Sequence, residues 1–593
     1  MRRLLPAALL AVLTVAGSAA AAAPSSAEGD PMTAGTSGRF DRPWNGFAPA
    51  STVLRNGTPE QVGLDPAPIE AALRGVEQLA VDGGSGRPMF SAAVTLLVHD
   101  GVVVAREATG YALRYAQVTS DGEAVELPRE EWVPARTDTI FDMASVSKLF
   151  TSIVVLQQVE AGRVDLDAPV ARYLPEFAEG GKETVTVKQL LTHTSGLPAW
   201  LPLWQSHPDR ESRIQAALRA PTEYTPGTGY VYSDLNLIAL GVLVERVTGS
   251  TLDTLVRQGI TEPLGMRDTG YNPPASVRDR VAATEYQANP PRGMVRGEVH
   301  DENAWSLGGV AGHAGVFSTA DDMAILGQAI LNGGSYRGAR ILRPDTVRLM
   351  LTNYNQAFPE NSHGLGFELD QRWYMDGLSG PRTAGHTGFT GTSIVIDPAS
   401  RSIAVLLTNR VHPTRNWGGN NPARRLVAQG LAQALGVRPV HGPDAWFSGV
   451  AENANAVLST GPLRAKGTVR VSFDAFVDTQ NDPDGVDQLV LESSADGVTW
   501  QTVPMVAHGP DAPGAVEALS GAGHRRWWQV RAELPAPQSG ELYLRWRYTS
   551  DSLYTGRGVY LDGIRVWSTG GVLLDGEREP GRLTAEGWRL ATR

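Results

Sequence analysis

Ser145 and Lys148 are the first residues of this chain whose types and spacing could do chemistry together. They lie in the stretch 141–150, and an apolar-rich run over 149–159 follows directly. On a helix, residues three apart lie on one face. Ser145 would lie in the first turn, where unpaired N–H groups and the positive end of the helix dipole gather. A serine hydroxyl becomes a nucleophile when a neighbouring base takes its proton, and a buried lysine with a destabilised ammonium would be such a base.

Lysine is rare in this chain. Of the 52 basic residues only four are lysines, at positions 148, 182, 188 and 466, and the other 48 are arginines. Lysine can lose its proton in a protein and arginine cannot. A lysine beside Ser145 therefore suits a group that must give up and regain a proton during a reaction. The alternative is a surface lysine that follows a serine by chance, so the pair needs partners elsewhere in the chain.

Two later stretches could supply those partners. Tyr232 and Asp234 precede an apolar segment, and the run His386-Thr387-Gly388 leads into a β-strand. A tyrosine can relay a proton between an attacking serine and a leaving group. A strand edge with small residues lets a substrate carbonyl approach backbone N–H groups, as an oxyanion hole requires. Each residue also has a structural alternative: a core tyrosine, a helix-capping aspartate and an ordinary strand histidine.

The other histidines are interpreted as structural. His193 is expected to fix a turn through side-chain hydrogen bonds, and His313 lies between glycines. The run His300-Asp301-Glu302 resembles a metal cluster. However, no second histidine stands at helical ligand spacing and there is no His-Glu-x-x-His, so neither a metal nor another cofactor is expected. No Gly-x-Ser-x-Gly occurs either, so the chain lacks the nucleophile elbow of an α/β-hydrolase.

The order of these motifs resembles that of the serine β-lactamase and penicillin-binding-protein superfamily. Its members carry Ser-x-x-Lys, then Tyr-x-Asn or a variant, then Lys-Thr-Gly or His-Thr-Gly. The likeness is to the class C-like branch, which includes D,D-peptidases, D-aminopeptidases and esterases, and it covers roughly residues 55–437. Four stretches carry the likeness beyond the three motifs: 139–148, 185–197, 226–241 and 309–318.

The resemblance implies a role for each candidate residue. Ser145 would be the acylated nucleophile and Lys148 its proton acceptor or relay. Tyr232 would be the partner base and later the proton donor to the leaving group. The backbone N–H groups of Ser145 and Phe389 would form the oxyanion hole. The implied substrate-binding residues are Asp234, His386, Thr387 and Gly388, and His386 could also tune Tyr232.

Two residues depart from the usual pattern of the superfamily. Asp234 stands where asparagine is more common, and its negative charge would raise the pKa of Lys148, which works against a free-amine base. His386 stands where many relatives have lysine, so it should grip a substrate carboxylate more weakly. We therefore do not expect efficient β-lactam hydrolysis. Esters, amides and D-amino-acid peptides remain open.

The flanking elements that would position these residues indicate an α+β domain over 51–440. A helix is expected from Pro66, and a strand pair over 92–98 and 102–105 turns at Asp100-Gly101. Two more strands (393–396 and 403–407) and a helix (422–435) end the region. Strands at both ends predict one antiparallel sheet, flanked by helices and with a helical lobe, as in β-lactamases and D,D-peptidases.

Residues 441–593 predict a separate β-sandwich. Alternating strands are separated by Gly, Asp and Pro turns, and no long amphipathic helix occurs there. The region resembles jelly-roll modules of secreted bacterial hydrolases, which makes attachment to a cell-wall or glycan surface a hypothesis. Asp478, Asp482 or Asp562 could bind calcium, but the simpler interpretation is that these aspartates belong to ordinary turns.

The N-terminal residues predict export. Residues 1–28 read as a signal peptide, with Arg2 and Arg3 before an apolar run and small residues after it, and 29–50 read as a linker. The expected product is a secreted protein without a membrane span. A net charge of −11 and a pI near 5.6 argue against nucleic-acid binding.

The sequence therefore predicts a secreted serine hydrolase that forms an acyl-enzyme at Ser145 with an ester or with a D-amino-acid amide or peptide. One alternative is a carboxylesterase without a role in peptidoglycan. The other is a protein that binds or senses acyl ligands without hydrolysing them. The sequence leaves the oligomeric state open.

Overall fold

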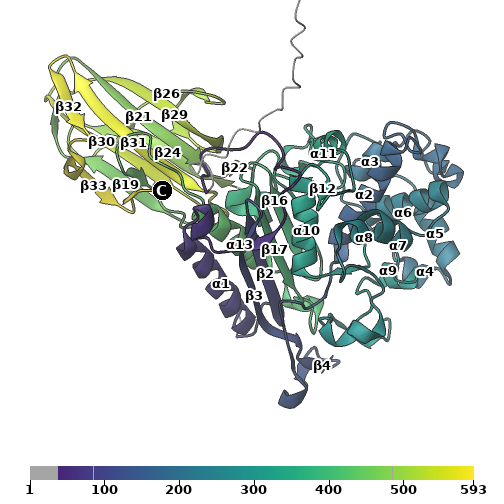
Figure 1. Cartoon of the computed structure of the whole chain (residues 1–593). Helices are drawn as coiled ribbons and strands as arrows, with labels where there is room; N and C mark the ends of the chain where they lie inside the picture. The colour runs from purple at the N-terminus through teal and green to yellow at the C-terminus, as the bar shows by residue number, and fades with distance from the viewer. Residues whose placement is uncertain (1–37, 85, 484) are drawn as a thin grey trace, which may run out of the picture. The chain divides into compact units, whose positions relative to one another are not determined.

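The computed structural model describes residues 38–593 except 85 and 484 (Figure 1). The predicted signal peptide and the first part of the predicted linker lie outside the described residues. The described residues belong to one compact unit.

The central sheet joins strands from both ends of the hydrolase region. Its order is β1-β3-β2-β17-β16-β15-β14, where β15 spans Ala384–Thr387 and the edge strand β14 spans Glu368–Leu369. β2 (Ala92–His99) pairs antiparallel with both β3 (Val102–Leu113) and β17 (Ser402–Thr408), and β16 (Ser393–Asp397) follows. The predicted antiparallel meeting of the two ends is confirmed, although the short β1 (Arg55–Asn56) joins β3 in parallel.

Both faces of this sheet are buried, because alternate side chains of β2 enter different cores. Val94 and Leu96 pack into the core that includes helix α10 (Ala320–Leu331). Ala93 and Leu97 pack into the core that includes α1 (Pro66–Val81) and α13 (Asn421–Ala434). Side chains of a strand alternate between faces, so the sheet separates two layers of helices (Figure 1).

A second group of helices forms the predicted helical lobe beside the sheet. The long helices α2 (Ser147–Glu160) and α6 (Asp234–Thr248) contribute many buried residues to the larger core. The other α-helices between α2 and α10 are α3 (Val187–Leu191), α4 (Leu203–Ser206), α5 (Arg210–Arg219), α7 (Leu252–Val256), α8 (Glu262–Leu264) and α9 (Glu302–Ser306).

The described part of the predicted linker is packed rather than free. Phe40 is 1% exposed and belongs to the α1–α13 core. The Phe40 amide donates to the Gly436 carbonyl at 2.8 Å, and the Trp44 amide donates to the Ala399 carbonyl at 2.8 Å. The composition of this segment suggested a linker, but one buried aromatic residue and its backbone hydrogen bonds fix it to the domain.

The C-terminal region forms two further sheets, as predicted for a sandwich. One has the order β27 (Gly514–Val516), β26 (Met505–His508), β29 (Ala522–Pro535), β21 (Thr468–Asp478), β31 (Gly558–Ser568), β18 (Ala445–Phe447), β34 (Arg589–Ala591). The other has the order β25 (Gln501–Thr502), β24 (Gln488–Ser494), β30 (Glu541–Thr549), β19 (Asn455–Thr460), β33 (Leu583–Glu586). In β21 (Thr468–Asp478), Val471 and Phe473 face the core between the sheets, which also contains Trp546. The predicted boundary between 440 and 441 remains a prediction.

The outer face of the first of these sheets packs against the hydrolase region. Phe476, together with Tyr560 of β31 (Gly558–Ser568) and Phe447 of β18 (Ala445–Phe447), joins the core of α1 and α13. Arg525 forms a buried ion pair with Asp397 at 2.6 Å. The two regions therefore share apolar and ionic contacts.

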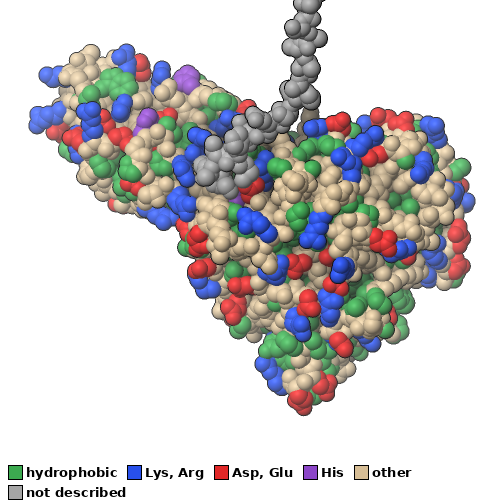
Figure 2. Space-filling model, in the orientation of Figure 1, with side chains coloured by type: hydrophobic (Ala, Val, Ile, Leu, Met, Phe, Trp, Pro, Cys, Tyr) green, Lys and Arg blue, Asp and Glu red, His purple; other side chains and the backbone are tan. Residues whose placement is uncertain are grey.

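Among the described residues no single helix is long and apolar enough to cross a bilayer. Taken together, α6 and the segment Leu252–Leu264 have the length and apolar composition of a membrane span, but they meet at a bend of 81°. On the face shown in Figure 2, acidic and basic side chains are interspersed rather than gathered into a field of one sign.

Candidate active site

Ser145 lies in a single 3-10 turn, Ala144–Val146, that leads directly into α2. The preceding residue, Ala144, has φ of 46°, which is uncommon for a residue with a side chain. Its amide donates to Asp142 Oδ1 at 2.8 Å, and this bond stabilises the turn. Such local strain is found at functional sites, and here it holds Ser145 ahead of the helix N-terminus.

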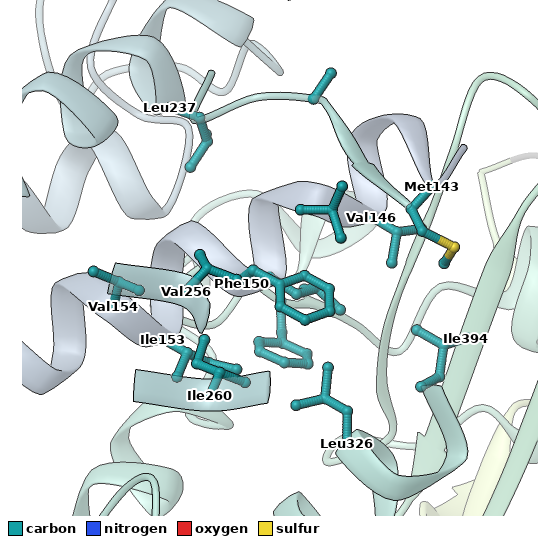
Figure 3. Close-up of a cluster of buried hydrophobic side chains, with 14 of the residues drawn as sticks. Met143, Val146, Phe150, Ile153, Val154, Leu237, Val256, Ile260, Leu326 and Ile394 are labelled. Carbon is teal, nitrogen blue, oxygen red and sulfur yellow. The ribbon is translucent and has the colours of Figure 1, made fainter. Parts of the chain in front are cut away.

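The core beneath this turn holds the helix in place. Met143, Val146 and Phe150 belong to one buried cluster with Leu326 and Ile394 (Figure 3). Leu326 comes from α10 and Ile394 from β16, so the start of α2 is packed against both the sheet and its covering helix. The Ser145 turn is thus fixed by the core rather than by its own short sequence.

Lys148 Nζ lies at the centre of the site. It donates to Ser145 Oγ at 2.9 Å and to the His313 carbonyl at 3.1 Å, and it pairs with Asp234 Oδ1 at 2.8 Å. It also lies 4.8 Å from the centre of the Tyr232 ring. The structure thus brings Ser145, Lys148, Tyr232 and Asp234 together, although they span 90 positions of sequence.

Lys148 is held as an ammonium. Burial alone would lower its pKa, but the Asp234 carboxylate and then Tyr232 outweigh burial and raise the pKa above the usual value. This raised pKa goes against the predicted neutral amine, for the reason that the Asp234 substitution suggested. A carboxylate at 2.8 Å stabilises the positive charge more than desolvation destabilises it.

The Tyr232 hydroxyl is buried and makes no hydrogen bond of standard geometry to the described residues. Burial raises its pKa to about 12, while the charge of Lys148 and interactions with Lys148 and Ser145 lower it. A buried polar atom without a partner is costly. Its place beside the nucleophile makes a bound substrate the natural partner.

His193 positions the segment that carries Tyr232. Its Nδ1 accepts from the Ser233 amide at 3.0 Å and from Asn236 Nδ2 at 3.1 Å. Its ring centre lies 4.7 Å from that of Tyr232. Burial, and next the charges of His363 and Lys148, lower the pKa of His193 well below its usual value, so the ring is neutral. The predicted structural role of His193 is confirmed, and it extends to the catalytic tyrosine candidate.

The loop after β15 (Ala384–Thr387) lies against the nucleophile turn. Thr390 Oγ1 donates to the Asp142 carbonyl at 2.7 Å, and Thr392 Oγ1 donates to the Met143 carbonyl at 3.0 Å. A Cβ at Gly388 would lie 2.4 Å from the Met143 carbonyl oxygen, so only glycine permits this approach. The Phe389 amide, which makes no hydrogen bond to the described residues, follows directly.

His386 and Thr387 end β15, whereas the sequence had placed them at the opening of a strand. His386 is 1% exposed, and its Nδ1–H donates to the Thr387 carbonyl at 2.7 Å. Burial and then the Lys148 charge lower its pKa to about 3. The ring is therefore neutral, and Nε2 is a buried acceptor without a partner. Thr387 is half-buried.

The sequence did not single out the part played by His313 and Asp301. The His313 carbonyl accepts from Lys148, and its ring Nε2–H donates to Asp301 Oδ1 at 2.9 Å. His313 lies in a glycine-rich stretch shared with the family pattern, which was the available signal. Asp234, Asp301 and His313 offer ligand atoms within 4.8 Å of one another, a spacing that a metal could use. Lys148 already pairs with Asp234, and His313 already pairs with Asp301.

The described geometry agrees with comparisons to known proteins. A family model described as Beta-lactamase matches residues 80–429. A protein of Escherichia coli (strain K12) named "Putative D-alanyl-D-alanine carboxypeptidase" is 33% identical over 392 residues, which cover 61% of this chain and 86% of that protein. A protein of the same name from Salmonella schwarzengrund (strain CVM19633) is 33% identical over 399 residues, 62% of this chain and 88% of that protein.

A solved structure shares the fold. "A class C beta-lactamase" superposes with a TM-score of 0.50 at 19% identity and covers 63% of this chain and 99% of that chain. The family model spans more than half of the sequence, and it includes the Ser145 turn, Tyr232 and His386. This chain therefore belongs to the β-lactamase family and is a serine hydrolase.

Proposed function

We propose that this protein hydrolyses esters, or amides and peptides of D-amino acids, through an acyl-enzyme at Ser145. One observation carries the proposal: Lys148 Nζ lies 2.9 Å from Ser145 Oγ while it is paired with Asp234 and faces the Tyr232 ring. The site thus places a nucleophile, a fixed positive charge and an unpartnered hydroxyl around one point.

The charges assign the proton transfers. Because Lys148 is an ammonium, Tyr232 is the group that takes the Ser145 proton, and in the same step it passes its own proton to the leaving atom. The negative charge that develops on the Tyr232 oxygen is stabilised by Lys148. The carbonyl oxygen receives hydrogen bonds from the amides of Ser145 and Phe389. Water, activated by the same tyrosine, then attacks the acyl carbon and frees Ser145.

The names of the relatives and the neutral His386 both bear on the proposed substrate class. The name of the Escherichia coli relative makes peptides ending in D-alanine one class to test. His386, however, presents an acceptor rather than a cation, so it would not bind a terminal carboxylate through charge. This observation favours esters and amides without a free carboxylate beside the leaving group.

The test compares turnover with labelling. Wild type and Ser145→Ala are assayed on p-nitrophenyl acetate, a D-alanyl-D-alanine peptide, a D-amino-acid amide and a chromogenic cephalosporin. A fluorophosphonate probe followed by intact mass locates the adduct. Turnover that requires Ser145 supports the hydrolase, whereas a stable adduct without turnover supports the acyl-binding alternative.

We also propose that the protein is exported and that the C-terminal sandwich attaches it to a cell-wall or glycan surface. The arginine pair and apolar run at the N-terminus support export. The sandwich shares a core with the hydrolase region, so the full chain is the right material to test. Full-length Ser145→Ala should sediment with insoluble wall material, and failure to do so would contradict the surface proposal. Amino-terminal sequencing of secreted protein would locate the cleavage site.

A further inference from the structure

Three exposed aromatic residues lie on segments that border the catalytic site. Trp200 is 45% exposed, Trp305 37% and Phe389 49%, and no other tryptophan or phenylalanine among the described residues is as exposed. Exposed aromatic surface that gathers at one place marks a binding site more often than isolated exposed residues do. The Phe389 amide, which makes no hydrogen bond to the described residues, is the one proposed for the oxyanion hole.

A cavity of about 300 Å³ is lined by one of these residues, Trp200. Trp200 and Trp204 contribute to one side of it, and Tyr286 of β9 (Tyr286–Gln287) contributes to another. Glu302, the first residue of α9, and Arg415 also line it. Aromatic faces with a few polar groups are typical of a site for a small ligand.

Three lining residues, or their neighbours in the chain, contact residues of the catalytic centre. The Ala199 carbonyl, next to Trp200, accepts from the Asp234 amide at 2.9 Å. Asp301, next to Glu302, bonds to the His313 ring, and the carbonyl of His313 accepts from Lys148. The Arg415 guanidinium lies 5.7 Å from the centre of the Phe389 ring.

The contacts of the cavity lining lead to the oxyanion loop rather than to the Tyr232 ring. The leaving group must lie beside the Tyr232 hydroxyl to receive its proton, and the Tyr232 ring is flanked by His193 at 4.7 Å and His386 at 6.0 Å between ring centres. The cavity lining, in contrast, includes Arg415, whose guanidinium lies 5.7 Å from the centre of the Phe389 ring, and Trp200, which follows the Ala199 carbonyl that accepts from the Asp234 amide. The part of the substrate that it receives is therefore the acyl part.

The cavity carries more acidic than basic charge among its lining residues. Glu285 and Glu302 both pair with the single guanidinium of Arg415. Glu285 also accepts from the Arg415 amide at 2.9 Å and pairs with His300 at 2.8 Å, so its oxygens are occupied. Glu302 uses Oε1 for Arg415 and for Gln287, and its Oε2 makes no hydrogen bond to the described residues. One carboxylate oxygen is thus free beside two tryptophans.

We propose that this cavity binds a protonated amine on the acyl part of the substrate, with Glu302 Oε2 as its hydrogen-bond acceptor and the Trp200 face as its second partner. This inference rests on the proposed acyl-enzyme function. An ammonium group would be stabilised both by a hydrogen bond to the free carboxylate oxygen and by a cation–π contact with the indole face. A carboxylate placed there would be repelled by Glu302, and a neutral group would gain from neither charge.

Matched substrates test the inference. Four substrates differ only at the end that would enter the cavity. They are the p-nitrophenyl esters of 6-aminohexanoic acid, 6-acetamidohexanoic acid and hexanoic acid, and the p-nitrophenyl monoester of adipic acid. We expect kcat/KM for the amine to exceed that for the acetamide by about tenfold, mainly through KM. The adipate monoester should be the slowest.

Variants assign the preference to the cavity. Glu302→Gln should reduce the amine-to-acetamide ratio to about one, and Trp200→Ala should lower it by about threefold. Glu262→Gln, an exposed glutamate paired with Arg257, is the matched control and should keep the wild-type ratio. Equal rates for amine and acetamide in wild type, or an unchanged ratio in Glu302→Gln, would overturn the inference. Hydrolysis that persists in Ser145→Ala would instead overturn the proposed function, and the inference with it.

Discussion

Lys148 and Lys182 are both buried, at 1% and 0% exposed, yet their surroundings give them opposite properties. Lys182 Nζ donates to the carbonyls of Glu179 and Ala220, at 2.6 and 2.5 Å, and makes no ion pair with the described residues. Burial lowers its pKa to about 8, against partial compensation by the charges of Glu179 and Glu183. Lys148 is also desolvated, but its contact with Asp234 raises its pKa instead.

The comparison shows that burial alone does not decide the charge of a lysine. Carbonyl oxygens accept hydrogen bonds from the Lys182 ammonium but carry no negative charge to balance it. The Asp234 carboxylate gives Lys148 both a hydrogen-bond acceptor and a negative charge. The lysine near the nucleophile is the one whose pKa is raised, whereas the pKa of Lys182 is lowered. A free-amine base would have required surroundings like those of Lys182.

The largest expected difference between the two lysines is in catalysis. Lys148→Met should lower kcat for an ester substrate by about 10³-fold or more, because it removes the charge that stabilises the developing Tyr232 anion. Lys182→Met should change kcat by less than about twofold. Circular dichroism establishes that both variants fold. Equal losses in the two variants would contradict a specific role for Lys148.

Replacing Tyr232 tests whether Lys148 acts through the phenol. Tyr232→Phe should lower kcat by about 10²-fold or more, in the range typical of general acid–base groups. In the double variant with Lys148→Met the loss should be little more than in Lys148→Met alone, because the two groups act in one step. Additive losses, measured by the same ester assay, would show that the two residues act independently.

Removing the carboxylate should make Lys148 behave more like Lys182. In Asp234→Asn the main cause that raises the pKa of Lys148 is lost while burial remains, so the pKa falls and the ammonium is lost as pH rises. We expect kcat/KM of the variant to be about 10-fold to 100-fold lower and to decline further from pH 7 to 10, relative to wild type. A pH profile with the wild-type shape would show that Asp234 does not set the charge.

The smallest expected effect concerns stability. The pKa of Lys182 is about 8 in the folded chain against 10.5 for an ordinary lysine, so the unfolded chain binds more protons between these pH values. Its contribution to the free energy of unfolding should therefore rise between pH 8 and 10.5, by on the order of 1–3 kcal/mol.

Urea unfolding of wild type and Lys182→Met across this range measures that difference. The gap between the two proteins should change with pH. Lys148 has the opposite sign, because its raised pKa gives stability that is present below 10.5 and is lost as pH rises through its folded value. A constant gap would contradict the lowered pKa of Lys182.

Much of the fold could be predicted because local patterns and the structure agree. Asp65 and Pro66 begin α1, and the Asp65 side chain accepts from the Ala67 amide at 3.0 Å. Asp100 and Gly101 turn β2 into β3 with φ of 48° and 77°. Caps, turns and alternating apolar residues act over a few positions, so the sequence alone shows them. The packing of the segment 38–50 was missed because it depends on partners such as Gly436, far along the chain.

The sequence by itself determined which residues would meet at the site, because the order of its motifs is specific to the β-lactamase family. It did not determine their charges. The proton on Lys148 and the free oxygen of Glu302 depend on contacts of about 3 Å or less between residues that are scores of positions apart, and the neutral acceptor of His386 depends on burial and on the charge of Lys148. Electrostatic energy changes steeply over such distances and with burial, so only the tertiary structure decided how this site divides its protons.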